Sequence, residues 1–162
     1  MATTLDTKTG IQKVGGIEID TSYFPLVILG MPRHPLTDAE VDGMITALTA
    51  ILRRREKHLV LIDGLDIELG INPKQRKAFT DFASNVEMRE LSRYKLADVL
   101  LLSSAILRGA MTAVFWIAPP VSPTKPFATI DEALPFVRER MQAGGLTLTP
   151  AMEARLAKLR RK

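Results

Sequence analysis

The segment that decides the fold is A-D-V-L-L-L-S-S-A-I-L-R-G-A-M-T-A-V-F-W-I-A-P-P, residues 97–120. It opens with an apolar run at residues 99–102, which is too short for a helix and suits a strand buried on both faces. Ser103 and Ser104 follow, and both are favoured N-cap residues, so we expect a helix to begin there. Because that helix is apolar around nearly its whole circumference, we expect it to pack against partners on two sides.

Strand and helix patterns alternate on both sides of this segment. Apolar runs or apolar–polar alternation predict further strands at residues 17–20, 26–31, 58–63 and 127–128. Helix N-terminal signals, each with a capping residue, occur at Thr37, Asn72, Thr129 and Thr149. This order predicts an α/β fold with a mixed sheet of about five strands, crossover helices and a basic C-terminal helix.

Two of the predicted helices carry details that a structure can test. We expect the helix that begins at Asn72 to bury one apolar face. The members of that face are Phe79, Phe82, Ala83 and Val86. In the helix after Thr129, Pro135 cannot donate a backbone hydrogen bond, so that helix is either kinked or begins near Leu134.

Length and composition are those of a single globular domain. The chain has 162 residues, of which 46% are hydrophobic, and this is enough for one core. We expect residues 1–10 to be disordered, residues 11–145 to form the domain and residues 146–162 to form a basic amphipathic helix. Cysteine is absent, which excludes a disulfide framework and a thiolate metal site.

The net charge of +4 comes from the C-terminal tail. The basic residues there are Arg155, Lys158, Arg160, Arg161 and Lys162, against one acid, Glu153. Of the 22 basic and 18 acidic residues in all, 17 of each lie outside this tail, so the rest of the chain is neutral. We interpret the tail as a solvated terminal helix packed on the domain. The alternative is that it binds an anionic lipid surface or nucleic acid, and we predict nucleic-acid binding nowhere else in the chain.

Residues 99–120 are the single candidate for a membrane span. Arg108 lies near their centre, where inserting it costs about 2.5 to 3.5 kcal/mol, so we predict no transmembrane segment. No charged-then-apolar leader follows Met1, and together with the lack of cysteine this predicts a soluble cytoplasmic protein.

Three short motifs are H-L-V-L-I-D-G at residues 58–64, L-L-L-S-S-A-I-L-R-G at residues 100–109 and F-A-T-I-D-E-A-L at residues 127–134. Together they resemble the STAS, or anti-sigma-factor-antagonist-like, domains of bacteria. The likeness covers residues 17–143 and implies a STAS-like fold with a regulatory role. The regulatory members carry a phosphorylatable serine in an Asp-Ser pair, which would fall near residues 71–74, I-N-P-K, where there is no serine. The resemblance is therefore to a subgroup without the phosphorylation switch. Other members of the family hold apolar ligands between sheet and helices.

The strand-to-helix turn also carries the best candidates for chemistry. Ser103 and Ser104 lie where backbone N–H groups can bind an oxyanion or a phosphate, and with Arg108 they form a candidate anion or ligand site. The glycines of a nucleophile elbow are missing around them, and the only imidazole bases are His34 and His58. We therefore expect N-capping rather than catalysis, and no cofactor.

An acidic cluster follows one predicted strand. Its members are Asp63, Asp66 and Glu68. Their spacing matches no EF-hand, and acids are common in loops, so we predict no metal site there.

The apolar helix after Ser104 favours binding over catalysis. We predict a non-enzymatic regulatory or scaffolding module that self-associates or docks another protein through this helix. The residues predicted to carry the interaction are Leu107, Arg108, Met111, Phe115 and Trp116. Phe115 and Trp116 are core residues if they are buried and interface anchors if they are exposed. Two alternatives stay open, a carrier or sensor of an apolar small molecule or lipid, and an enzyme that uses Ser103 or Ser104.

Overall fold

The computed structural model describes residues 10–67, 71–117 and 119–160. Its centre is a mixed sheet whose six strands lie side by side in sequence order. The strands are β1 (Ile11–Val14), β2 (Ile17–Asp20), β3 (Leu26–Gly30), β4 (His58–Asp63), β5 (Lys95–Leu101) and β6 (Thr124–Phe127). The helices are α1 (Asp38–Arg53), α2 (Pro73–Ser84), α3 (Val86–Leu91), the 3-10 helix η1 (Ser92–Tyr94), α4 (Ala105–Ile117), α5 (Ile130–Ala143) and α6 (Pro150–Ala157).

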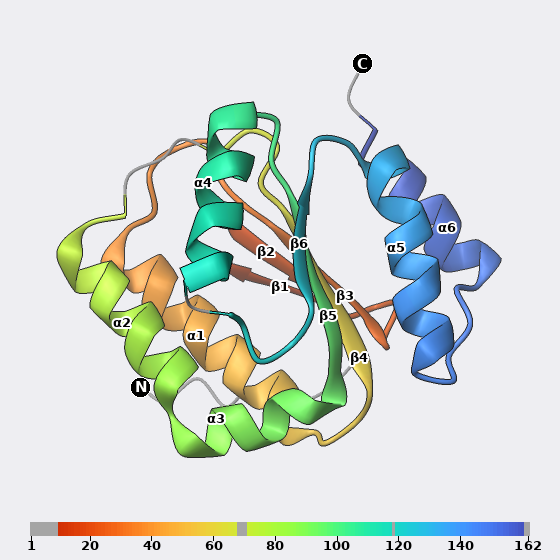
Figure 1. The fold of residues 1–162 in the computed structure, drawn as a ribbon, viewed down its shortest axis with the longest axis horizontal. Coiled ribbons are helices and arrows are strands. Elements are labelled where there is room, and N and C mark those ends of the chain that lie inside the picture. The colour runs from red at the N-terminus through yellow and green to blue at the C-terminus, as the bar shows by residue number, and fades with distance from the viewer. Residues whose placement is uncertain (1–9, 68–70, 118, 161–162) are drawn as a thin grey trace.

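The direction of the strands divides the sheet into two parts. β1, β2 and β3 form an antiparallel meander. β3, β4, β5 and β6 are parallel, and each connection between them steps to the next strand in the same direction. Right-handed crossovers of that kind place their helices on one face of the sheet. Figure 1 shows α1, α2, α3 and α4 on one face, while α5 and α6, which follow the last strand, cover the other.

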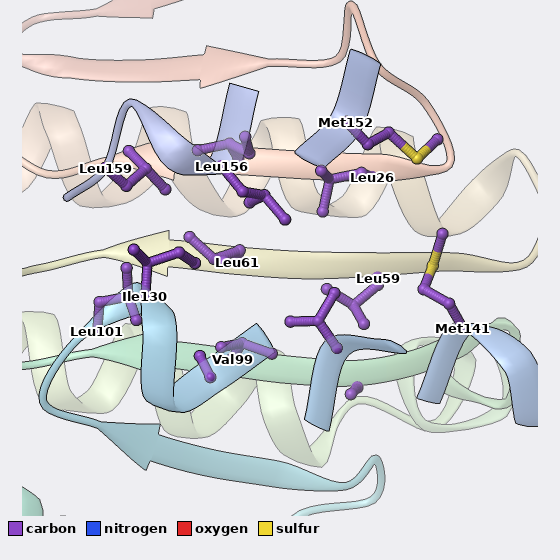
Figure 2. Packing of buried hydrophobic residues seen from close by; sticks show 14 of the residues in the cluster. Leu26, Leu59, Leu61, Val99, Leu101, Ile130, Met141, Met152, Leu156 and Leu159 are labelled. Atoms are coloured by element: carbon purple, nitrogen blue, oxygen red, sulfur yellow. The ribbon is translucent and has the colours of Figure 1, made fainter. Parts of the chain in front are cut away.

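Apolar cores lie on both faces of the sheet. Along β4, Leu59 and Leu61 belong to the core under α5 and α6, whereas Val60 belongs to the core under α1. In the first of these cores, Met141 of α5 and Leu156 of α6 are fully buried near the strands (Figure 2). The alternation of side chains along the strands thus supplies both layers.

The predicted α/β fold with a mixed sheet and a C-terminal helix is confirmed, but the sheet has six strands rather than five. The additional strand, β1, is an edge strand with no buried residue, and Gln12 and Lys13 occupy its centre. It therefore lacks the apolar run that identifies the other strands. Four predicted N-caps are confirmed, because the side chains of Thr37, Asn72, Thr129 and Thr149 each accept a backbone N–H.

Two predictions about helices are corrected. Ala83 and Val86 are exposed rather than buried, because Asn85 ends α2 and caps α3, which turns the chain between them. Phe79 and Phe82 of the same predicted face are half-buried. Pro135 lies inside α5, which begins at Ile130, so the alternative start near Leu134 is wrong.

The structure tests the prediction for the C-terminal end of the chain but not that for residues 1–9. Met152 and Leu156 of α6, and Leu159 just after it, lie in the core beneath α5 and α6. The basic C-terminal helix is therefore packed on the domain through its apolar side. Of the ten N-terminal residues expected to be disordered, residues 1–9 lie outside those that the structure describes.

Candidate interaction surface

The turn from β5 into α4 uses its two serines in different ways. The Ser104 hydroxyl accepts the backbone N–H of Leu107 at 3.3 Å, so Ser104 is the predicted N-cap. The Ser103 hydroxyl donates to the carbonyl oxygen of Leu65 at 2.7 Å and links this turn to the loop after β4. Both hydroxyls therefore hold the start of α4 in place.

Arg108 is the one charged residue of α4, and it reaches back to the turn before its own helix. Its Nη1 donates to the carbonyl oxygen of Leu102 at 2.6 Å and to that of Ser103 at 2.8 Å. The guanidinium thus satisfies backbone carbonyls at the end of β5. The rest of the helix surface has no charged group.

One side of α4 contacts the domain. Leu107 is buried, and Met111 and Phe115, which follow it at intervals of one turn, are half-buried. The helix packs beside β6, the last strand in the sheet order (Figure 1). Of the 13 residues of α4, Leu107 alone is buried.

The opposite side of α4 is apolar and exposed. We define the α4 outer face as the residues on this side, which are Ile106, Gly109, Ala110, Ala113, Val114, Trp116 and Ile117. Its largest side chains are almost fully accessible, since Ile106 is 85%, Trp116 is 84% and Ile117 is 87% exposed. A contiguous exposed apolar patch is typical of an interaction site.

The expectation that α4 packs against partners on two sides is wrong for the single chain. The reason is its place in the fold, because α4 is the last crossover helix and lies at the β6 edge of the sheet. Of the five residues predicted to carry an interaction, Trp116 is exposed, Leu107 is buried, and Arg108, Met111 and Phe115 are half-buried. Sequence reasoning did not assign Ile106 and Ile117 to the interaction, because apolar residues surround the helix and hydropathy alone cannot show which side faces the sheet.

A pocket lies near the α4 turn, where β4 and β6 end. Its volume is about 290 Å³, at the lower end of the range for ligand pockets. Its lining consists of Leu65, Asp66, Ser103, Ala128, Thr129, Ile130, Asp131, Leu159 and Arg160. Of the candidate anion or ligand site, Ser103 lines this pocket, whereas Ser104 caps α4 and Arg108 binds backbone carbonyls. The Arg108 guanidinium contacts the backbone carbonyl of Ser103, but the two serine hydroxyls bond to other groups, so the three side chains do not converge on one site.

The basic tail begins with an ion pair inside the chain. Arg155 Nε lies 3.1 Å from Asp20 Oδ2, and the two side chains are 17% and 3% exposed. Burial by itself raises the pKa of Asp20, but hydrogen bonds from Ser22 and the interaction with Arg155 outweigh it, so the pKa of Asp20 lies below its usual value. This pair ties α6 to β2.

The remaining cations of the tail lie further out. Arg160 pairs with Asp131 at 2.8 Å, and both side chains are more than half exposed. Lys158 is exposed, while Arg161 and Lys162 lie outside the described residues. Binding of an acidic surface by the tail stays a prediction, and of the three tail cations that the structure describes, Arg155 and Arg160 form ion pairs within the chain.

His58 lies at the opposite end of the parallel strands from the two serines. His58 begins β4 and lies opposite Lys95, the first residue of β5, in the strand register, whereas Ser103 follows the end of β5. His58 is buried, its Nδ1 lies 2.8 Å from the carbonyl oxygen of Glu56, and its Nε2 has no hydrogen-bond partner among the described residues. Burial lowers the pKa of His58. The other histidine, His34, is more than half exposed beside the buried Glu40 carboxylate.

The acidic cluster after β4 is described only in part. Asp63 and Asp66 both interact within the chain, and Glu68 lies outside the described residues. Among the residues that are described, no group of three or more potential metal ligands occurs.

Comparisons with known proteins do not identify the chain further. No protein-family model, no curated protein and no solved structure matches it. The STAS-like resemblance therefore stays a prediction. Within the described ranges, no helix combines the length and the hydropathy needed to cross a bilayer. The cytoplasmic location also stays a prediction.

Proposed function

We propose that the chain is a non-enzymatic protein-interaction module with a regulatory or scaffolding role, and that the α4 outer face is its binding surface. One observation carries this proposal. The helix has a single charged residue and 13 residues in all, yet it buries only Leu107 in the domain. Most of the apolar surface of α4 is therefore left exposed in the single chain.

The energetics of α4 support the same conclusion. Burying a large aliphatic or aromatic side chain contributes about 1.5 to 3 kcal/mol relative to leaving it in water. Ile106, Trp116 and Ile117 each forgo most of this contribution in the single chain, because each is more than four-fifths exposed. A partner that covers these side chains recovers the contribution, and tryptophan is one of the residue types enriched among interface hot spots.

The contacts of the serines and histidines support a non-enzymatic role. The Ser103 and Ser104 hydroxyls bond to backbone groups, and His58 lies at the other end of the parallel strands. The STAS-like resemblance is part of the proposal as well, supported by its three motifs alone.

The carrier alternative would use the pocket near the α4 turn. That pocket joins Leu65, Ile130 and Leu159 to the charged side chains Asp66, Asp131 and Arg160. A lining of this composition suits a wholly apolar ligand less well than the uncharged α4 outer face suits an apolar partner surface. We therefore rank the carrier second.

Site-specific photo-cross-linking in cells of the source organism tests the proposal. A photoreactive amino acid replaces Trp116, and in a matched control it replaces Glu139, which is exposed on α5. We expect one discrete protein adduct from position 116 that disappears when Ile117→Asp is added, and none from position 139. No adduct from position 116, or an adduct of small-molecule mass, would contradict the proposal.

A further inference from the structure

The α4 outer face is also self-complementary. Resting on the proposed function, we infer that its partner is the same face of a second copy of this chain, with the two α4 helices packed antiparallel about a two-fold axis. Three properties of the described residues lead to this: the charge of the face, the spacing of large and small residues, and the exposed area.

The α4 outer face carries no charged side chain, and this disfavours charged partners. Residues 99–130 contain no acidic residue, and their only basic residues are Arg108 and Lys125. The Arg108 guanidinium is engaged by two carbonyl oxygens of its own turn. A nucleic acid or a charged peptide would therefore leave its charges unpaired on this face, whereas the same face of a second copy is equally uncharged.

The large and small residues of α4 are spaced so that they fit against the same residues of an antiparallel second copy. A two-fold axis that crosses the helix between residues 111 and 112 brings Ile106 of one copy beside Ile117 of the second copy, and Ala110 beside Ala113. With a rise of about 1.5 Å and a turn of about 100° per residue, the same axis places Trp116 over Gly109 of the second copy. Large residues thus lie at the ends of the face and small ones at its centre, where packed helices approach most closely.

The space above Gly109 is open. A Cβ atom built on Gly109 meets no heavy atom within 4 Å, so the single chain does not fill this position. An indole ring from the second copy can therefore lie directly on the helix backbone there. Because the axis repeats the contact, each dimer has two such tryptophan–glycine contacts.

The exposed area fits a weak dimer. The large apolar side chains of α4 that are more than half exposed are Ile106, Val114, Trp116 and Ile117, and Val121 just beyond the helix is exposed as well. At about 60 to 120 Å² for an aliphatic side chain and up to about 250 Å² for tryptophan, they offer on the order of 500 Å². A standard interface buries about 800 Å² per partner. We therefore expect association to depend on concentration, with a dissociation constant on the order of 1 to 100 μM.

Sedimentation of the full chain, from about 1 to 500 μM, tests the dimer. We expect the 17.9 kDa monomer at the low end and a two-fold dimer at the high end. Gly109→Leu adds bulk in space that is open in the monomer and should weaken the dimer by about tenfold or more. Ala143→Leu is the matched control, because Ala143 is exposed at the end of α5 on the other face of the sheet from α4, and it should leave the dimer unchanged. Circular dichroism should show both variants folded.

Disulfide cross-linking tests the register, since the chain has no cysteine of its own. In the antiparallel pair, the two copies of residue 106 lie about 16 Å apart along the helices, too far for a disulfide, as do the two copies of residue 117. Ile106→Cys alone and Ile117→Cys alone should therefore stay uncross-linked, and a mixture of the two should cross-link. Cross-linking of either variant with itself, but not of the mixture, would overturn the antiparallel arrangement.

The outcomes also separate this inference from the proposed function. A wild-type chain that remains monomeric throughout the concentration range overturns the second copy as the partner. If the adduct formed at position 116 in cells then has the mass of a different protein, the proposed function stands without the dimer. A monomer that binds phosphatidylcholine vesicles through Trp116, and gives no protein adduct in cells, overturns both.

Discussion

Helices α1 and α4 occupy equivalent positions in the chain topology but differ in how much of each helix is buried. Each connects two parallel strands, and both lie on the same face of the sheet (Figure 1). In α1, which has four charged residues, six of 16 residues are buried, whereas α4 has one charged residue and buries one of 13. The more apolar helix is thus the less buried one. Position over the sheet, rather than hydropathy, decides burial here, since α1 packs on the core that includes β2, β3 and β4, while α4 lies at the β6 edge.

Truncating one side chain in each helix should give the largest contrast. Met44→Ala in α1 removes a residue that is 5% exposed, and the lost burial plus the cavity should lower the free energy of unfolding by about 2 to 5 kcal/mol. Ile117→Ala in α4 removes one that is 87% exposed and should change it by about 0.5 kcal/mol or less. Urea denaturation at low micromolar concentration, where the chain is monomeric, measures both. Equal losses for the two variants would show that α4 is as well packed as α1.

A second comparison tests how α6, unlike α4, is held on the domain by a buried ion pair. Arg155→Met leaves the buried Asp20 carboxylate without its cation and should cost about 2 kcal/mol of unfolding free energy. Arg138→Met is the control, because its ion pair with Glu153 is about half exposed and should be worth about 0.5 kcal/mol or less. Both values come from the same denaturation experiment. A loss no greater for Arg155→Met than for the control would mean that α6 is held by its apolar side alone.

Acid should weaken the fold through His58 before it affects the carboxylates. The pKa of His58 is lowered from 6.5 by burial, and Lys95, Asp98 and Arg54 are the charged groups that act on it. Above pH 6.5 the ring is neutral in both folded and unfolded chains, so its contribution to stability is complete there. As the pH falls from 6.5 toward the lowered folded pKa, the unfolded chain gains a proton that the folded chain does not, and stability declines.

The measurement is the free energy of unfolding between pH 7 and pH 5, and the comparison variant is His58→Gln. We expect the slope in this window to be smaller in His58→Gln than in the wild type. A wild-type stability that is flat across the window would contradict the account of His58.

The smallest expected effect is a gain in stability within α4. Gly109→Ala replaces a helical glycine whose Cβ position is open, and the lower flexibility of the unfolded chain should raise the unfolding free energy of the monomer by about 0.5 to 1 kcal/mol. Thermal unfolding at low micromolar concentration measures it. A loss of stability would mean that the α4 backbone is already covered in the monomer.

The sequence contains most of the information for the fold. The apolar run at residues 99–102, the other buried strands and the capping residues Thr37, Asn72 and Thr129 predicted the α/β order that the structure has. β1 could not be predicted in the same way, because none of its residues is buried and its stability comes from backbone pairing with β2. The local pattern of apolar and polar residues does not show which backbone segments pair.

The candidate site was predictable as an element but not as a surface. The apolar character of α4 and the N-cap at Ser104 could both be predicted from residues 97–120. Which side of α4 faces water could not, because Leu107 and Ile106 are equally apolar and differ only in where the sheet ends. The same lack of tertiary information hides the contact of Arg155, whose partner, the Asp20 carboxylate, is distant in sequence.

Trp116 is the chain's single tryptophan, so its fluorescence reports directly on the α4 outer face. The most direct test is its emission spectrum as a function of protein concentration, measured for the wild type, Gly109→Leu and Ala143→Leu. We predict red-shifted emission from the dilute wild type and a blue shift as its concentration rises through the micromolar range. Ala143→Leu should show the same shift, and in Gly109→Leu the shift should need about tenfold or more higher concentration. An emission maximum that is independent of concentration in the wild type, or a shift at the wild-type concentration in Gly109→Leu, would contradict the dimer.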